Sequence, residues 1–258
     1  MEDEGIRNRY TDFQNFFLGY EVYRIPDKNL ARFFPLPQAT RLPEHLLHLY
    51  LSTKFWTLYL PMAYIIVGLG NPGEEYVNTR HNVGRIVLET FAKKNDFSPW
   101  DKSGKLNALV SEGKIGKEKV QLVMPETFMN KSGASVSPLI KSAKAAEKLI
   151  VVHDDLDLPL GRFKVSFNRG PGGHRGVLSI MKVLKTEAFV RVKVGISPET
   201  PSGKLKKPQG EKAVEDFILG KCKPAEESEL KKIAKKVSEA LEMIISESRD
   251  KAMGEFNH

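Results

Sequence analysis

Residues 64–84 read YIIVGLGNPGEEYVNTRHNVG, and this stretch predicts the start of an α/β fold. Residues 64–67 are an apolar run of the kind that forms a buried strand. The glycine-rich loop that follows exposes its backbone, and His81 then stands at the start of a helix with apolar periodicity. A strand that leads into a polar loop and a histidine is a common way to build a site in an α/β protein.

The composition is that of a soluble globular enzyme. The chain has 258 residues, of which 28% are charged and 41% hydrophobic. A net charge of +8 favours an anionic partner such as nucleic acid. The single cysteine, Cys222, excludes an internal disulfide and a multi-cysteine metal site, and fits a reducing, cytoplasmic setting. No stretch resembles a membrane span or a signal peptide, so we expect no membrane partner.

Residues 1–61 differ from the rest of the chain. They hold seven basic and seven acidic residues and 12 of the 23 aromatic residues, but no chemical motif. Two interpretations stay open. The segment is an N-terminal extension of unknown role, or Met62 is the true start and the upstream residues are a wrongly assigned reading frame. In both cases residues 62–258 form the predicted catalytic domain.

From residue 63 onward, strand and helix patterns alternate. This alternation predicts an α/β fold: a single-domain sandwich with a central mixed, largely parallel sheet flanked by helices. The predicted strands are residues 64–69, 106–112, 119–124, 149–153, 162–167 and 189–196. The predicted helices are residues 83–94, 132–145, 176–184, 213–219 and 225–246.

The glycines of residues 68–73 formally match the G-x-G-x-x-G fingerprint of dinucleotide-binding proteins. The surroundings argue against a nucleotide site. Pro72 removes one backbone donor, and Glu74 and Glu75 put negative charge where the phosphates would lie. A nucleotide-dependent oxidoreductase therefore rests on the glycine pattern alone.

Two groups of polar residues indicate acid–base chemistry. His81 is the candidate general base, because an imidazole takes up and returns a proton near neutral pH. The run VVHDDLD at residues 151–157 puts carboxylates after an apolar strand, where one of them can orient a histidine. His153 and its neighbouring aspartates offer metal ligands as well, but there is no HExxH-like spacing, and we expect no metal.

Two further loops carry candidate binding groups. Residues 127–133 read TFMNKSG, in which Asn130 is either a helix cap or a carboxamide that binds a substrate carbonyl. Residues 168–176 read NRGPGGHRG, a glycine-rich loop suited to close approach of a ligand. There is no G-x-S-x-G motif, and nothing places Cys222 beside a base, so no covalent nucleophile is predicted.

Four motifs together resemble the bacterial-type peptidyl-tRNA hydrolases. In order they are VGLGNPGEEYVNTRHNVG, PETFMNKSG, VVHDDLDLPLG and GPGGHRG, and the resemblance covers residues 64–246. It implies an enzyme that cleaves the ester between a peptide and the terminal ribose of tRNA, and so recycles tRNA from aborted translation. It also implies a monomer that uses no cofactor and acts on peptidyl-tRNA.

The resemblance assigns roles to individual residues. His81 would activate water, and Asp154 would bind its imidazole and hold the tautomer. Asn71 and Asn130 would position the peptide carbonyl and the water, with Asn130 as an oxyanion donor. The pocket around the ester would be shaped by Tyr76 and Met129.

The chain departs from the family pattern in two places. Arg175 follows His174 where the family commonly has asparagine, and Ser166 occupies the position of a frequent lysine. We assign the remaining substrate and tRNA contacts to His174, Arg175, Lys164, Arg169, Arg191 and Lys193. The alternative from another class is a non-catalytic RNA-binding relative, against which the pairing of a base with an orienting acid argues.

Overall fold

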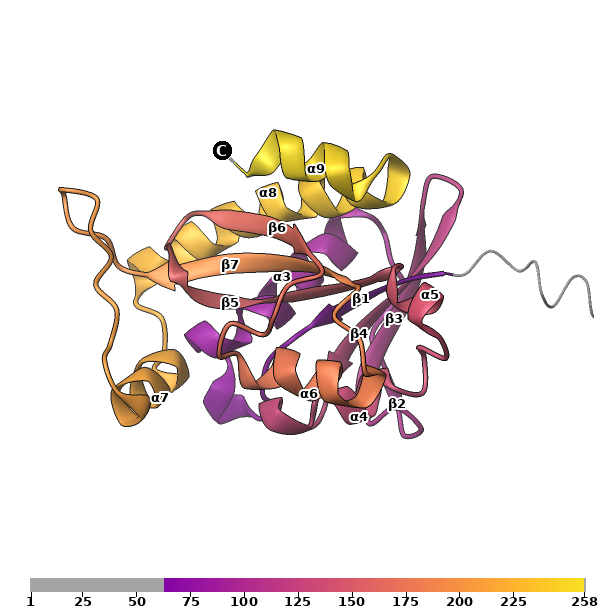
Figure 1. Cartoon of the computed structure of the whole chain (residues 1–258), viewed down its shortest axis with the longest axis horizontal. Helices are drawn as coiled ribbons and strands as arrows, with labels where there is room; N and C mark the ends of the chain where they lie inside the picture. Colours follow the sequence, from indigo (N-terminus) through magenta and orange to yellow (C-terminus); the bar gives the residue numbers. More distant parts are fainter. Residues whose placement is uncertain (1–62, 258) are drawn as a thin grey trace, which may run out of the picture. The chain divides into compact units, whose positions relative to one another are not determined.

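The computed structural model describes residues 63–257. The predictions made for residues 1–62 therefore lie outside the described residues. Within the described part, one seven-stranded sheet carries helices on both faces, as Figure 1 shows, and the predicted α/β class is confirmed. No helix among residues 63–257 is long and apolar enough to cross a membrane.

The sheet is mixed, and its parallel part lies in the centre. The strand order is β2-β3-β4-β1-β5-β7-β6. Neighbours among β4, β1, β5 and β7 pair in parallel, whereas β2, β3 and β6 are joined antiparallel at the two sides. The bounds are β1 Tyr64–Gly68, β2 Asp101–Ser103, β3 Ala108–Ile115, β4 Glu118–Pro125, β5 Leu149–Pro159, β6 Phe163–Phe167 and β7 Val190–Ser197.

Helices cover the two faces of the sheet and bury a separate apolar layer on each. On one face lie α3 (Val83–Lys94), α8 (Pro224–Ser246) and α9 (Arg249–Phe256), which pack on residues such as Ile66 and Val152. On the other face, α4 (Gly133–Val136) and α6 (Arg175–Leu184) pack on Val67 and Val151. Neighbouring strand residues thus face opposite layers, as the period of a strand requires. The remaining elements are η3 Glu74–Tyr76, η4 Arg80–Asn82, η5 Met129–Lys131, α5 Ala143–Ala146 and α7 Glu211–Leu219.

The structure corrects the predicted helix at residues 132–145. The chain instead forms two short helices, α4 and α5, with an irregular stretch between them. Pro138 lies in that stretch, where its missing N–H and its ring oppose a continuous helix. The prediction over-extended a weak apolar pattern across a residue that ends helices.

The strand predicted at residues 149–153 is longer than expected. β5 runs on to Pro159, because its acidic residues keep pairing with β7 through Asp154↔Val194 and Asp155↔Gly195. Asp154 therefore lies inside a strand rather than in a loop after it. Among the strands and α-helices, β2 and α9 were not predicted, and neither were the short 3-10 helices η3, η4 and η5.

The approach of α3 to the sheet depends on glycine. A Cβ added at Gly84 would lie 2.5 Å from the backbone nitrogen of Leu69 and 2.5 Å from the carbonyl oxygen of Val152. The helix start thus rests directly on the backbone of β5 and of the residue after β1, with no room for a side chain. This contact places the preceding turn, η4, beside the polar end of β5.

We predict that Gly84→Ala destabilises the protein by more than about 2 kcal/mol, because the new methyl group meets backbone atoms that have no alternative position. The matched control is Gly254→Ala in α9, where an added Cβ meets nothing within 4 Å. That change should stabilise by about 0.5–1 kcal/mol through helix propensity. Urea unfolding of the three proteins tests this, and an equal effect of both substitutions would contradict it.

Candidate active site

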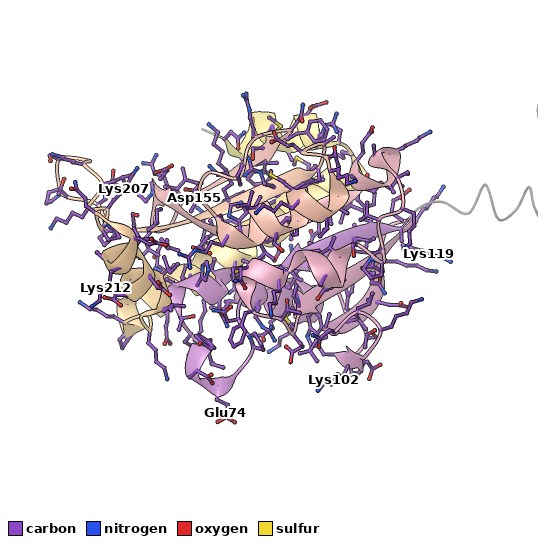
Figure 2. The ribbon with its side chains drawn as sticks, turned by 60° about the horizontal axis from the view of Figure 1, so that its bottom comes forward. Glu74, Lys102, Lys119, Asp155, Lys207 and Lys212 are labelled. Atoms are coloured by element: carbon purple, nitrogen blue, oxygen red, sulfur yellow. The ribbon has the colours of Figure 1, made fainter. Side chains whose placement is uncertain are left out.

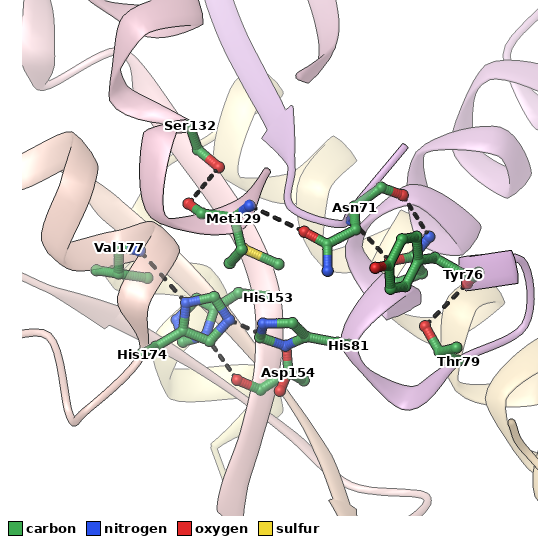
Figure 3. A network of polar contacts seen from close by, with 11 residues as sticks. Asn71, Tyr76, Thr79, His81, Met129, Ser132, His153, Asp154, His174 and Val177 are labelled. Carbon is green, nitrogen blue, oxygen red and sulfur yellow. Dashed lines mark hydrogen bonds and ion pairs between the residues drawn. The ribbon is translucent and has the colours of Figure 1, made fainter. Parts of the chain in front are cut away.

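The site is centred on a buried carboxylate that two imidazoles share. His81 Nδ1 lies 2.8 Å from Asp154 Oδ1, and His174 Nε2 lies 3.0 Å from the same oxygen (Figure 3). The three residues come from η4, β5 and the residue before α6. Asp154 is 4% exposed and His81 6% exposed, so both contacts are shielded from bulk water.

The hydrogen bonds assign the tautomers of the histidines. Asp154 accepts at Oδ1, so His81 carries its proton on Nδ1 and leaves Nε2 as a free base. His174 accepts the backbone N–H of Val177 at Nδ1, at 3.3 Å, and therefore donates from Nε2 to Asp154. His81 lines the cleft and its Nε2 has no hydrogen-bond partner among residues 63–257, so that nitrogen is available to a water.

Burial alone raises the pKa of Asp154, but the two imidazoles outweigh burial and hold that pKa well below its usual range. The carboxylate is thus ionised at neutral pH. Beside it, burial and the neighbouring His174 lower the pKa of His153 well below its usual value, so His153 is neutral. The ionised carboxylate therefore lies directly against His81 and His174, an arrangement that stabilises a proton arriving on His81.

A cleft of about 730 Å³ opens beside this cluster. One wall is formed by residues 128–131, another by the glycine-rich loop before α6, and a third by α7. Its lining includes Asn71, Tyr76, His81, Phe128, Met129, Asn130, His153, Asp154, His174, Arg175, Lys193, Lys207, Glu211, Val214 and Ile218. The polar cluster and the cavity therefore make one site.

Asn71 joins the loop after β1 to η4 and to η5. Its Oδ1 accepts the backbone N–H of Met129 at 2.8 Å. The side chain of Asn82 binds both its backbone N–H, at 2.8 Å, and its carbonyl oxygen, at 2.9 Å. Because Oδ1 is occupied as an acceptor, Nδ2 of Asn71 is left to donate toward a ligand (Figure 3).

Comparisons with known proteins show the family of the chain. The family model described as peptidyl-tRNA hydrolase matches residues 65–258. A peptidyl-tRNA hydrolase of Carboxydothermus hydrogenoformans is 40% identical over 195 residues, which is 75% of this chain and 98% of that protein. The one from Syntrophotalea carbinolica is 35% identical over 195 residues, 75% of this chain and 96% of that protein.

A solved structure of peptidyl-tRNA hydrolase from Acinetobacter baumannii is 30% identical, with a TM-score of 0.68 over 77% of this chain and 96% of that one. The chain belongs to the peptidyl-tRNA hydrolase family. As a member of that family it is a hydrolase acting on ester bonds, which agrees with the resemblance seen in the sequence motifs.

The predicted peptidyl-tRNA hydrolase residues fall into two groups. Those assigned to the chemistry and the pocket lie together with two of the predicted substrate contacts: the cleft is lined by His81, Asp154, Asn71, Asn130, Tyr76 and Met129, and by His174 and Arg175. Lys193 lines it too and forms an ion pair with Asp155. Lys164 and Arg169 are exposed and lie outside the cleft lining.

The structure corrects the prediction for Arg191 and adds a contact for His174. Arg191 is only 3% exposed, and its Nε and Nη1 are buried without partners among the described residues, so a phosphate of tRNA has no access to them. His174 directs Nε2 to Asp154 rather than leaving it for substrate. This hydrogen bond helps to hold the carboxylate of Asp154 in place.

Sequence reasoning missed one wall of the cleft altogether. α7 contributes Glu211, Val214 and Ile218, which no motif marked. Phe128 was also missed, although it stands next to Met129 and is 58% exposed, unusual for so large an apolar side chain. Burial raises the pKa of the Cys222 thiol to about 11, in agreement with its interpretation as an unreactive residue.

We predict that Asn71→Ala lowers the free energy of unfolding by about 1–3 kcal/mol, because it leaves the buried N–H of Met129 without an acceptor. Activity should fall as well, since residues 129–131 lose their tether. The control is Ser246→Ala, which removes an exposed bond within α8 from Oγ to Glu242. Thermal unfolding and hydrolysis of an N-acetyl-aminoacyl-tRNA measure the two effects, and a stability loss no larger than in the control would contradict the prediction.

Proposed function

We propose that the protein hydrolyses the ester bond of peptidyl-tRNA, or of an N-acyl-aminoacyl-tRNA, with a water molecule that His81 activates. The products are free tRNA and a peptide. The observation that carries this mechanism is the buried 2.8 Å contact between His81 Nδ1 and Asp154 Oδ1 at the cleft, with Nε2 of His81 left free. The family membership supports the substrate and the reaction class.

In the proposed first step, Nε2 of His81 accepts a proton from water as the water oxygen attacks the ester carbonyl carbon. The imidazole becomes positively charged against the ionised carboxylate of Asp154, which stabilises it. The carbonyl oxygen becomes an oxyanion, to which N–H donors at Asn71 Nδ2 and Asn130 Nδ2 would contribute. Asn130 is exposed at the cleft wall, so it would meet the oxyanion only with substrate bound.

In the second step the tetrahedral intermediate collapses. The bond between the carbonyl carbon and the ribose oxygen breaks, and the proton on His81 Nε2 passes to that oxygen. His81 is thereby restored, and the two products are a carboxylic acid and the ribose hydroxyl of tRNA. No side chain becomes acylated in this scheme.

His174 would support the reaction through Asp154. Its Nε2–H donates to the oxygen that also binds His81, so it favours the ionised carboxylate and limits its rotation. A carboxylate held in this way keeps His81 in the tautomer with Nε2 free.

The rim of the cleft supplies cations that would meet the tRNA backbone. Arg175 pairs with Glu211, Lys193 with Asp155, and Lys207 with Asp157, so phosphates would compete with carboxylates at these positions. Figure 2 shows Lys207 and Lys212 at the same end of the molecule as Asp155. Lys131 lines the cleft and has no ion-pair partner among residues 63–257, which favours it as an additional phosphate contact.

The biological setting is part of the same proposal. The protein would recycle tRNA from aborted translation, and it would do so as a monomer in the cytoplasm. The role of residues 1–61, and the question whether Met62 is the true start, remain predictions from the sequence.

We predict that His81→Ala lowers kcat by about 10²–10⁴-fold, the usual contribution of a general base. Binding of the N-acetyl-aminoacyl-tRNA should persist, because the phosphate contacts lie on the rim. Initial rates and a filter-binding titration measure the two quantities with the same substrate. If the wild type and the variant both bind the tRNA and neither cleaves it, the protein is a non-catalytic RNA-binding relative instead.

The same cluster gives a prediction about metals. The ligand atoms of His81, Asp154 and His174 lie within 4.8 Å of one another, a spacing that a divalent ion is able to bridge. We expect hydrolysis to need no metal, because Asp154 Oδ1 already accepts both imidazole N–H groups. Activity should be unchanged after treatment with a chelator and dialysis. A loss that added Zn²⁺ or Mn²⁺ restores would contradict this.

A further inference from the structure

Arg80, the residue directly before His81, has a side chain that joins distant parts of the chain. Its Nη2 lies 2.9 Å and 2.7 Å from the two carboxylate oxygens of Glu226 in α8. Its Nη1 donates to the carbonyl oxygens of Phe217, at 3.0 Å, and Gly220, at 3.2 Å. The guanidinium group therefore holds the end of α7 and the start of α8 at once.

Further contacts make this junction rigid. The guanidinium carbon of Arg80 stands 4.4 Å from the centre of the Phe217 ring. The backbone N–H of Arg80 donates to the carbonyl oxygen of Gly220 at 3.3 Å, and the N–H of Cys222 donates to that of Asn78 at 2.8 Å. Arg80 is 9% exposed, so these contacts are screened from water.

α7 needs such an anchor. None of its residues is buried, yet five of them line the cleft: Glu211, Val214, Glu215, Ile218 and Leu219. At its first residue the helix is held by the ion pair between Glu211 and Arg175, whose side chains are 81% and 56% exposed. An ion pair this exposed contributes little to the stability of the attachment. The position of α7 therefore depends on the contacts that its C-terminal end makes with Arg80.

The contacts require arginine in particular. A planar fork of N–H groups is able to bind a carboxylate on one side and two carbonyl oxygens on the other. A lysine ammonium in the same space keeps the positive charge but is able to bind only some of these oxygen atoms.

We propose that Arg80 is a positioning residue that fixes the α7 wall of the substrate cleft relative to His81. It is bonded through the backbone to the proposed base, and its side chain holds the wall on which substrate is bound. The inference rests on the proposed function, since it takes His81 as the base. The base itself has its own anchor in Asp154, so loss of Arg80 should disturb the wall and spare the chemistry.

The kinetic test compares the wild type with Arg80→Lys on an N-acetyl-aminoacyl-tRNA. We expect KM to rise about five-fold or more while kcat stays within about two-fold, as happens when an interaction made equally in the ground and transition states is lost. The acidic side of the pH–rate profile should not move. A normal thermal transition ensures that the comparison is made on folded protein.

Glu226→Gln is the milder variant: it removes the charge that Arg80 faces and keeps one side-chain oxygen as an acceptor for Arg80 or for the backbone N–H of Lys223. Its matched control is Glu242→Gln, also in α8, whose carboxylate pairs with Lys94 of α3 at 2.9 Å and contacts no part of the cleft lining. We expect a smaller rise in KM for Glu226→Gln and none for Glu242→Gln. Equal effects of the two substitutions would overturn the proposal.

A second readout does not depend on catalysis. Amide hydrogen exchange in α7 should be faster in Arg80→Lys than in the wild type, with α3 unchanged. Unchanged exchange in α7 overturns the inference. So does a fall in kcat with a shifted pH profile and a constant KM, because Arg80 would then act on His81. If the wild type itself does not hydrolyse the substrate, the proposed function fails, and the exchange measurement still decides whether Arg80 anchors α7.

Discussion

The arrangement of the site follows from a contact that only glycine allows. Gly84 lies so close to the backbone of Leu69 and Val152 that no side chain fits between them. The start of α3 is thereby pressed onto the centre of the sheet. The turn before it, η4, then brings His81 to the polar part of β5, where Asp154 lies.

Once η4 and β5 meet, the buried polar groups around them form hydrogen bonds with one another. Asp154 accepts from His81 and from His174, Asn71 accepts from Met129, and Asn82 binds the backbone of Asn71. A buried network of this kind stabilises only when its members are paired, so each bond restricts the others. The result is that Nε2 of His81 and Nδ2 of Asn71, the groups that act in the proposed mechanism, are left for the cleft.

The outer part of the cleft is built differently. α7 has no buried residue and belongs to the site through two arginines, the buried Arg80 and the exposed Arg175. Around it, acidic residues pair with the rim cations Lys193 and Lys207. The proposed reacting centre thus rests on the sheet, whereas the α7 wall of the cleft depends on side-chain contacts at its edges.

The sequence by itself determined the elements with strong local patterns, and it pointed to the residues that the proposed mechanism uses. Local patterns were sufficient to predict β1, β5 and α3, because strand and helix periods are local properties. The patterns are the apolar runs at residues 64–67 and 149–153 and the periodicity of residues 83–94. The motifs singled out His81 and Asp154, which the structure brings into contact.

Only the tertiary structure decided which groups meet across long distances. Arg80 and Glu226 are 146 positions apart, and no motif links them. Arg191 looked like a phosphate ligand because its charge is visible in the sequence, whereas its burial depends on what the rest of the chain packs around it. His174 likewise carried a motif, but its direction toward Asp154 follows from where α6 begins relative to β5. Residue type is encoded locally, but burial and contact are properties of the packed chain.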